Sequence, residues 1–196
     1  MSDWKIIGLS GTNGAGKDTV GQILADYGYL FESVSEPLRV EARKRGLPVK
    51  REFLRKISAE WRREFGLGVL VDRAIDLWKS YGDKYVGVVV CPMRNTGEAQ
   101  HLKDLGGILI WIDADQRTRY DRIQANIEAR GRAGEDNKTF EQFLREEADE
   151  MKPPIGADAS ALNGAGVKAM SDIFIDNSSE EVEQLRAKVI KELGLK

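Results

Sequence analysis

Short stretches rich in apolar residues recur five times along the chain, and glycine, proline or polar residues follow each of them. Apolar runs of this length are typical of strands that a parallel sheet buries on both faces. The stretch Tyr-Val-Gly-Val-Val-Val-Cys at 85–91 shows the pattern most clearly. We therefore predict strands at residues 6–10, 30–34, 85–91, 107–112 and 173–175.

Between these stretches, apolar residues recur every three or four positions, as they do on one face of a helix. The charge-rich segment 37–80 predicts three helices and no strand. The segment 152–168, with its prolines, glycines and alanines, predicts a loop. Further helices are predicted from Lys17 to about Gly28, at 117–130, at 139–151 and from Ser179 to about Leu193. Strands that alternate with helices indicate an α/β fold on a parallel sheet with right-handed crossovers.

The composition is that of an ordinary globular enzyme, with 41% hydrophobic and 32% charged residues. The length of 196 residues corresponds to about one domain. The 30 basic and 32 acidic residues leave a formal net charge of −2, which argues against a general nucleic-acid-binding surface. The chain has neither an apolar signal core nor a stretch approaching the roughly 20 apolar residues of a membrane span. We expect a cytoplasmic protein without nucleic-acid or membrane partners.

Cys91 is the only cysteine and His101 the only histidine. This excludes a disulfide framework, a structural zinc site and catalysis that requires two histidines. Cys91 ends an apolar strand, so we expect it in the core rather than as a reactive thiol. We expect His101 to be exposed or packed rather than catalytic.

Residues 11–19 read Gly-Thr-Asn-Gly-Ala-Gly-Lys-Asp-Thr and match the phosphate-binding pattern G-x-x-x-x-G-K between a predicted strand and a predicted helix. The glycines let the backbone curl until successive N–H groups point inward, where they and the helix N-terminus hold an anion. Lys17 adds a positive charge for the β- and γ-phosphates. We expect ATP to be bound by Thr12, Asn13, Gly14, Ala15, Gly16, Lys17, Asp18 and Thr19.

Asp18 stands where the usual pattern has serine or threonine, whose hydroxyl binds Mg²⁺ directly. A carboxylate beside a polyphosphate repels it unless a cation or a neighbouring arginine intervenes. Asp18 is therefore a candidate Mg²⁺ ligand, directly or through water. The alternative, of equal weight, is an acidic residue that the helix dipole favours in the first turn.

Arginines near the ends of predicted elements are candidates for the rest of a phosphoryl-transfer site, because a planar guanidinium grips two phosphate oxygens at once. Arg39 follows the second predicted strand and Arg94 the third, at the edge where ligands bind in open α/β sheets. Arg130 and Arg132 lie where a closing lid would sit. The alternative for each is a solvated surface position. We expect solvated positions for Arg43, Arg45, Arg51, Arg55, Arg62 and Arg63.

The segment 172–177, Asp-Ile-Phe-Ile-Asp-Asn, brings the last predicted strand to the same edge of the sheet. A loop there can lie against an adenine ring. An Asx turn followed by a helix N-cap explains the same residues equally well.

With these motifs, the chain resembles the nucleoside-monophosphate-kinase-like P-loop kinases, and within them an archaeal-type group related to adenylate kinase and dephospho-CoA kinase. The resemblance covers nearly the whole chain. The phosphate loop is highly specific for binding a nucleoside triphosphate, and the remaining pieces are moderately specific as a set. These pieces are residues 35–39, 42–47, 63–66, 93–95, 131–136 and 172–177.

The resemblance implies a P-loop NTPase fold, a three-layer sandwich with about five parallel strands in the order 2-3-1-4-5. It implies a single domain over residues 1–196. The core would span 1–34, 84–129 and 170–196, with a helical acceptor-binding insertion at about 35–83 and a short lid at about 130–139.

The resemblance also implies transfer of the γ-phosphoryl group of ATP, with Mg²⁺, to a nucleotide-like acceptor. Lys17 would stabilise the moving phosphoryl group, and Arg39 and Arg94 would hold the anionic group of the acceptor. The loop at Asn177 would border the adenine. The donor phosphates would be clamped by Arg122, Arg130 and Arg132, and the catalytic set would be Lys17, Arg94, Arg130 and Arg132.

One departure from the family pattern is Cys91, which stands where such kinases usually carry an acidic residue. Either Asp18 replaces that carboxylate at Mg²⁺, or the protein binds nucleotide without efficient catalysis. The leading hypothesis is a kinase for nucleoside or deoxynucleoside monophosphates, active as a monomer or homodimer, with dephospho-CoA as the alternative acceptor. A nucleotide-binding switch or weak ATPase is the hypothesis of another class. A nucleic-acid end kinase is disfavoured by the neutral charge.

Overall fold

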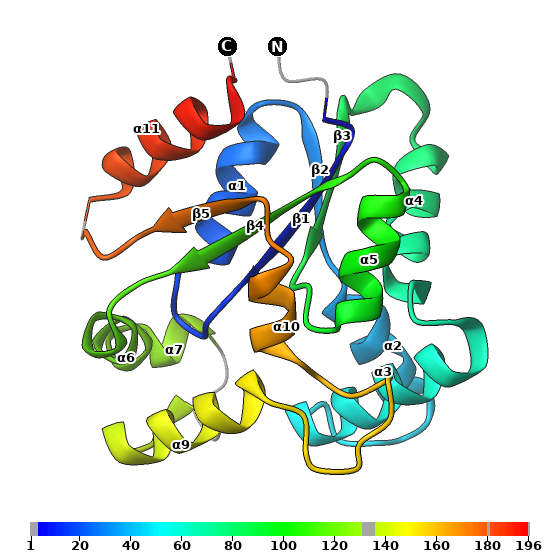
Figure 1. Ribbon diagram of the computed structural model, residues 1–196, viewed down its shortest axis with the longest axis vertical. Helices are drawn as coiled ribbons and strands as arrows, with labels where there is room; N and C mark the ends of the chain where they lie inside the picture. Colours follow the sequence, from blue (N-terminus) through cyan, green and yellow to red (C-terminus); the bar gives the residue numbers. More distant parts are fainter. Residues whose placement is uncertain (1–3, 131–135, 180, 196) are drawn as a thin grey trace.

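The computed structural model describes residues 4–130, 136–179 and 181–195. Five parallel strands form one sheet in the order β2-β3-β1-β4-β5 (Figure 1). The strands are β1 (Ile6–Gly11), β2 (Tyr29–Ser33), β3 (Gly87–Cys91), β4 (Ile108–Asp113) and β5 (Ile173–Asp176). The predicted strands, the α/β class and the strand order of the P-loop fold are confirmed.

Helices cover both faces of the sheet, and a third group lies beyond the carboxyl ends of the strands (Figure 1). One face is covered by α1 (Lys17–Asp26) and α11 (Val182–Leu193), and the other by α4 (Val69–Ser80), α5 (Thr96–Asp104) and α10 (Gly164–Ala169). The third group comprises α2 (Ser35–Lys44), α3 (Arg51–Phe65), α6 (Gln116–Ala125), α7 (Ile127–Arg130) and α9 (Phe140–Met151). A short 3₁₀ helix, η1 (Gly82–Lys84), precedes β3.

The alternation of side chains along each strand divides the core into two clusters, one on each face of the sheet. On β1, Ile7 and Leu9 pack with α1 and α11, whereas Ile6 packs with the helices of the opposite face. Gly8 points to that opposite face, where a Cβ atom would lie 2.7 Å from a methyl group of Leu102 in α5. Gly8 thus lets α5 lie directly on the central strand.

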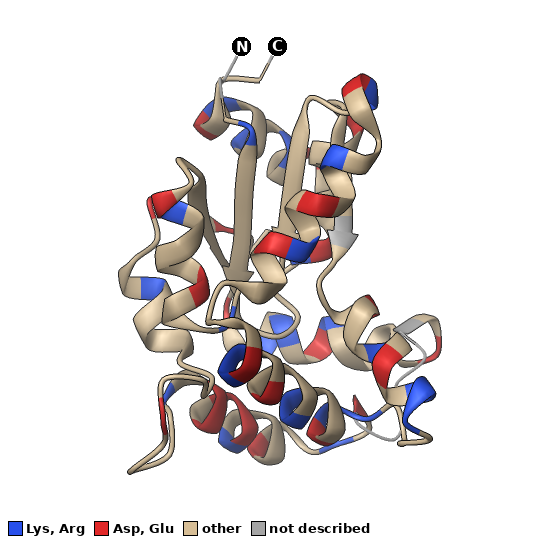
Figure 2. Ribbon diagram, turned by 90° about the vertical axis from the view of Figure 1, so that its right-hand side faces the viewer, with Lys and Arg blue, Asp and Glu red and all other residues tan. Residues whose placement is uncertain are grey.

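Charged residues gather on the helices and leave the strands nearly free of charge (Figure 2). Many of them lie on the helices beyond the carboxyl ends of the strands, where pairs of opposite charge join different elements. Within the described residues, none of the helices is long and apolar enough to cross a membrane.

Two segments differ from the prediction. The helix expected at 117–130 is interrupted at Asn126, which separates α6 from α7. The loop expected at 152–168 ends in α10, where the Asn163 side chain accepts a hydrogen bond from the Gly166 N–H at 2.8 Å. Glycine-rich sequence has low helix propensity, so this N-cap and the complete burial of Val167 stabilise the short helix.

A buried ion pair fastens the segment before α10 to the helical insertion. Arg62 Nη2 of α3 lies 2.7 Å from Glu98 Oε1 of α5, and the two side chains are 3% and 2% exposed. Arg62 also donates to the Ser160 carbonyl at 3.2 Å, and Asn95 donates to the backbone carbonyls on either side of Ser160. The expectation that Arg62 is solvated is wrong, because its partners lie 36 and 98 positions away in the sequence.

We expect Glu98→Ala to lower the free energy of unfolding by about 3–5 kcal/mol, because it leaves the Arg62 charge buried without its counter-charge. The matched control is Glu52→Ala, which removes an ion pair with Lys56 whose two side chains are both 67% exposed. That variant should leave the stability nearly unchanged, because exposed ion pairs contribute little. Urea denaturation measures both. Equal effects of the two substitutions would contradict a structural role for the buried pair.

Candidate functional site

The phosphate loop, defined here as residues 11–16, faces a cavity of about 960 Å³ at the carboxyl edge of the sheet. The loop and the start of α1 form one wall, and α2 and α3 of the insertion form the other. The ends of β2 and β3 form the floor between them. This volume is at the upper end of the roughly 300–1,000 Å³ typical of small-molecule sites. The phosphate loop and the insertion therefore face each other across one continuous space.

The backbone of the phosphate loop is curled as the sequence predicts. Gly14 and Gly16 have φ angles of 81° and 95°, in the left-handed region that favours glycine. At Gly16 a Cβ atom would also lie 2.5 Å from Nδ2 of Asn177. Asn177 Nδ2 donates to the carbonyl oxygen of Ala15 at 2.9 Å, so the loop after β5 supports the phosphate loop directly.

Lys17, the first residue of α1, folds back over the phosphate loop. Its Nζ donates to the carbonyl oxygens of Gly11 at 3.0 Å and of Thr12 at 2.6 Å. Desolvation, followed by repulsion from Arg94, lowers the pKa of Lys17 to about 8. An anion bound in the loop would favour the charged amine and raise that pKa again.

Asp18 and Cys91 both line the cavity beside Lys17. Asp18 is exposed, and among the described residues its carboxylate has no hydrogen bond or ion pair. Cys91 is buried at the end of β3, as expected, and burial raises the pKa of its thiol to about 12. A neutral thiol is not a ligand for Mg²⁺. The only free carboxylate next to the Lys17 amine on this wall is therefore that of Asp18, within the described part of the chain.

Asp113, at the end of β4, holds the phosphate loop from the other side. Thr12 Oγ1 donates to Asp113 Oδ1 at 2.7 Å. Burial opposes the ionisation of Asp113, but hydrogen bonds from Thr12, Trp111 and the Ala114 N–H outweigh it and lower the pKa of the carboxyl group. The ionised carboxylate thus fixes the Thr12 side chain, and with it the start of the loop.

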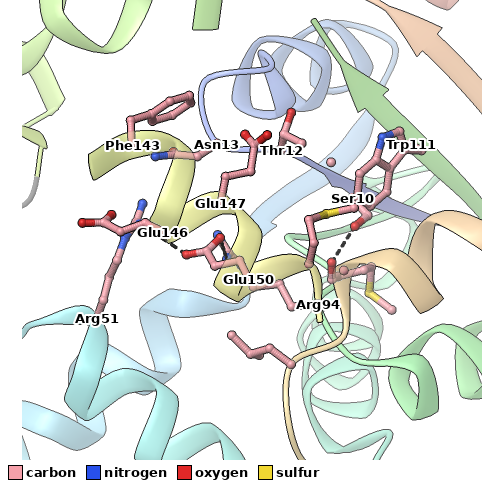
Figure 3. A pocket seen from close by; sticks show the side chains of 15 residues that line it. Ser10, Thr12, Asn13, Arg51, Arg94, Trp111, Phe143, Glu146, Glu147 and Glu150 are labelled. Carbon is pink, nitrogen blue, oxygen red and sulfur yellow. Dashed lines mark hydrogen bonds and ion pairs between the residues drawn. The ribbon is translucent and has the colours of Figure 1, made fainter. Parts of the chain in front are cut away.

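Arg119 of α6 is a third support of the loop. Its side chain is 2% exposed, and it donates to the carbonyl oxygens of Ala114 at 2.8 Å and Asn13 at 3.3 Å. Glu147 of α9 accepts two hydrogen bonds from the same guanidinium. The pair joins α9 to the phosphate loop. Glu147 also lines a small cavity of about 30 Å³ together with Thr12 and Asn13 (Figure 3).

Glu150, one turn further along α9, lies at the centre of an arginine cluster. Its carboxylate is 2.8 Å from Arg94, 3.3 Å from Arg51 and 2.5 Å from Arg55. Burial raises the pKa of Glu150, but the three guanidinium groups outweigh it, with Arg94 first, and lower it to about 2. Figure 3 shows Glu150 on α9 between Arg51 and Arg94.

Arg51 and Arg55 were expected to be solvated. The expectation is wrong for Arg51, whose side chain is 23% exposed, whereas the Arg55 side chain is 47% exposed. They line the large cavity and meet a carboxylate that comes from α9, 99 and 95 positions away in the sequence. Helical spacing in α3 alone does not indicate such a partner. The side of the cavity formed by the insertion thus carries more arginines than the sequence predicted.

The structure places the remaining predicted residues as follows. Arg39 lines the cavity and donates to Glu36 at 3.0 Å. Arg122 donates to the carbonyl oxygens of Asn177 at 2.8 Å and Ser179 at 2.5 Å, at the far end of the cavity. Thr19 lines the cavity as well. The side chain of Arg130, at the end of α7, and the whole of Arg132 lie outside the described residues.

Sequence reasoning missed Asp113, Arg119, Glu147 and Glu150. A signal for Asp113 exists, because an aspartate that directly follows an apolar strand next to β1 falls at the ligand-binding edge. Arg119 and the two glutamates give no such signal, since their roles depend on how α6 and α9 pack. His101, as expected, lies away from the cavity, with Nε2 2.6 Å from Asp72 Oδ1.

Solved structures with the same fold include several kinases. A shikimate kinase from Acinetobacter baumannii, in complex with shikimate, has a TM-score of 0.54 at 18% identity and covers 98% of this chain and 94% of its own. A gluconokinase from Sinorhizobium meliloti has a TM-score of 0.50 at 15% identity, with 98% and 93% covered. The protein TT1252 from Thermus thermophilus reaches 0.55 at 17% identity, with 98% of both chains covered. The chain has the fold of the P-loop kinases.

No protein-family model matches the chain. A UPF0200 protein from Pyrobaculum aerophilum is 28% identical over 190 residues, which cover 96% of each chain. A UPF0200 protein from Pyrococcus abyssi is 31% identical over 155 residues, which cover 77% of this chain and 80% of that protein. The phosphate-loop protein described here therefore belongs to the UPF0200 family.

Proposed function

We propose that this protein is an ATP-dependent phosphotransferase that transfers the γ-phosphoryl group to a nucleotide-like acceptor, in the first place a nucleoside or deoxynucleoside monophosphate. The observation that carries the proposal is the arrangement across one cavity, where the phosphate loop with Lys17 faces a group of arginines. Those that line the cavity on the acceptor side are Arg39, Arg51, Arg55, Arg62 and Arg94. In phosphoryl transfer, the protein mainly positions the two substrates and supplies positive charge to the transferred group, and it takes little part in covalent chemistry.

The donor half of the site is the phosphate loop and its supports. The inward N–H groups of the loop and the start of α1 would bind the β- and γ-phosphates. Lys17 Nζ would exchange its bonds to the Gly11 and Thr12 carbonyls for phosphate oxygens. The loop held by Arg122, at the far end of the cavity, would border the base. ATP would thus lie with its γ-phosphate toward the insertion.

The acceptor half would present an oxygen of the acceptor's phosphate to that γ-phosphorus. The new phosphorus–oxygen bond forms as the bond to the bridging β-oxygen breaks, so that ADP leaves. Lys17 would stabilise the charge on the moving group, and Arg94 would orient the acceptor phosphate. The fold shared with kinases supports this reading.

The residues present fit a Mg²⁺ ion through Asp18. This cation keeps several waters and is usually held by one or two carboxylates and by substrate phosphates, so a single exposed carboxylate beside the loop is a sufficient anchor. When bound, the ion neutralises charge on the β- and γ-phosphates. Asp18 would then take the part of the acidic residue that Cys91 replaces. No group of three or more His, Cys, Asp or Glu within the described residues forms a site that could hold a metal without substrate.

The neutral thiol of Cys91 also favours a second candidate, a nucleotide-binding switch or weak ATPase. Such a protein would bind ATP through the same loop and show no acceptor-dependent turnover. Dephospho-CoA is the alternative acceptor of a kinase, since its diphosphate would suit the same arginines.

The decisive experiment is phosphoryl transfer from labelled ATP with Mg²⁺ to nucleoside monophosphates, deoxynucleoside monophosphates, dephospho-CoA and water. We expect one class of nucleotide acceptor to gain label. Lys17→Ala should lower this turnover by about 10²–10³-fold or more, because it removes a charge used in the transition state. Lys44→Ala, at an exposed position of α2, is the matched control and should be as active as the unaltered protein. Release of phosphate to water alone would instead identify the weak ATPase.

Substitution of Asp18 by asparagine should raise the Mg²⁺ concentration that gives half-maximal turnover. We expect a shift at least as large as the roughly 10–100-fold loss of metal affinity seen when outer partners of metal sites are removed. ATP affinity without Mg²⁺ should be unchanged or higher, since a repulsive carboxylate is lost. Asp26→Asn, on the same helix and outside the cavity, is the control. An unaltered Mg²⁺ titration would remove Asp18 from the metal site.

Binding of ATP at pH 8 should take up protons through Lys17. With a pKa of about 8, about half of the Lys17 amines are neutral at that pH, and bound phosphate raises the pKa and recharges them. The uptake should vanish at pH 6.5, where the amine is already charged. Calorimetry in buffers of different ionisation enthalpy measures the proton count. A Lys17→Met variant that still binds ATP with the same uptake would refute this assignment.

A further inference from the structure

The proposed chemistry does not use the carboxylate of Glu150. This carboxylate is bound to arginines that the proposed function assigns to the acceptor side of the cavity. It lines the large cavity on its acceptor side, and only 18% of its side chain is exposed. Within the described residues, the ion pairs of Arg55 and Arg94 are all with Glu150. Two guanidinium groups from different elements thus share one negative charge, and Arg51 joins them.

Three other basic groups that line the cavity have different partners. Arg39 pairs with Glu36 of its own helix, and Arg62 with Glu98. Lys17 donates to the carbonyls of the phosphate loop. Among the described residues, Arg55 and Arg94 therefore have Glu150 as their counter-charge.

We propose that Glu150 sets the affinity of the acceptor site by acting as an internal competitor: its carboxylate occupies the place of the acceptor's phosphate on Arg55 and Arg94, and the acceptor must displace it. This inference rests on the proposed function in one respect, namely that the acceptor is anionic. A phosphate dianion supplies one negative charge to each of the two guanidinium groups, and its oxygens suit their planar forks. A neutral acceptor supplies no charge to replace that of Glu150 and leaves its ion pairs with the arginines in place.

The position of Glu150 on α9 makes its release local. Glu150 lies in the last turn of the helix, and residues 152–159 that follow are exposed. Phe143, which is 2% exposed, and the Glu147–Arg119 pair anchor the preceding turns against α6. Met151, next to Glu150, packs against a core cluster. The segment beyond it is exposed, however, and a terminal turn of this kind opens at lower cost than the interior of the fold. Glu150 can therefore leave the arginines while the anchored part of α9 stays in place.

The test is the binding of the four ribonucleoside 5′-monophosphates, measured by calorimetry while a non-hydrolysable ATP analogue saturates the donor site. Glu150→Gln should tighten the binding of the monophosphate that the unaltered protein binds, by about tenfold or more, because the competing charge is gone. Glu150→Asp keeps the charge and should stay closer to the unaltered protein. Glu141→Gln, an exposed position in the first turn of α9, is the matched control and should change nothing. If Glu150 merely scaffolds the arginines, Glu150→Gln weakens binding, and unchanged or weaker binding overturns the proposal.

A second measurement needs no variant. Hydrogen exchange in the last turn of α9 should become faster when the monophosphate binds to the unaltered protein, since Glu150 is released. Slower or unchanged exchange there, with the ligand bound, refutes the displacement, and failure of every monophosphate to bind refutes it as well. This test and the transfer assay address different proposals. Tighter binding by Glu150→Gln without phosphoryl transfer would reject the kinase activity and support the role of Glu150 as a competitor. Phosphoryl transfer without tighter binding would support the kinase activity and reject that role of Glu150.

Discussion

The curled backbone of the phosphate loop is the constraint on which the rest of the site depends. A chain segment whose N–H groups all point inward has few hydrogen bonds of its own, so it needs support from its neighbours. Two strand ends and helix α6 provide that support. Asp113 holds Thr12, Asn177 holds the Ala15 carbonyl, and Arg119 reaches the Asn13 carbonyl from below β4. The order of the strands places these groups around the loop. The conformation of the site therefore depends directly on the topology of the sheet.

A site that binds polyanions, as proposed here, needs a concentration of positive charge at one edge of the sheet. Such charge repels itself unless carboxylates are interleaved with it. In this protein two glutamates of one helix do so, Glu147 at Arg119 and Glu150 at the arginines of α3 and β3. Because they lie one turn apart on α9, the donor and acceptor halves of the cavity are tied to the same helix. A shift of the whole helix would therefore affect both sides, whereas opening of its last turn would affect only Glu150.

The fold and the phosphate loop could be predicted because their signals are local. The strands are apolar runs, and the glycines within residues 11–19 determine the curled backbone of the loop. The arginine cluster could not be predicted, because the sequence pattern of α3 resembles an exposed helix face. The partner of Arg51 and Arg55 is Glu150, which lies 99 and 95 positions further along the chain. The same holds for Arg62, whose counter-charge Glu98 begins a different helix. The helix α10 escaped prediction for a related reason, because its stability comes from an asparagine cap and one buried valine rather than from helix-forming residues.

Two residues near Lys17 differ from the pattern of the P-loop kinases that the chain resembles: Cys91 stands in place of an acidic residue, and Asp18 in place of serine or threonine. We interpret the two differences as one change. A carboxylate at position 91 would be buried at the end of β3, with Lys17 and Arg94 as the nearest positive charges, and Arg94 is already neutralised by Glu150. Burying it there would cost more than placing it on the exposed first turn of α1, where the helix dipole favours a negative charge. At position 18 the carboxylate remains solvated and can approach a cation that arrives with the phosphates. Cys91 then fills the space at the end of β3 as a neutral, apolar group. The negative charge near Lys17 is that of the Asp18 carboxylate in the first turn of α1.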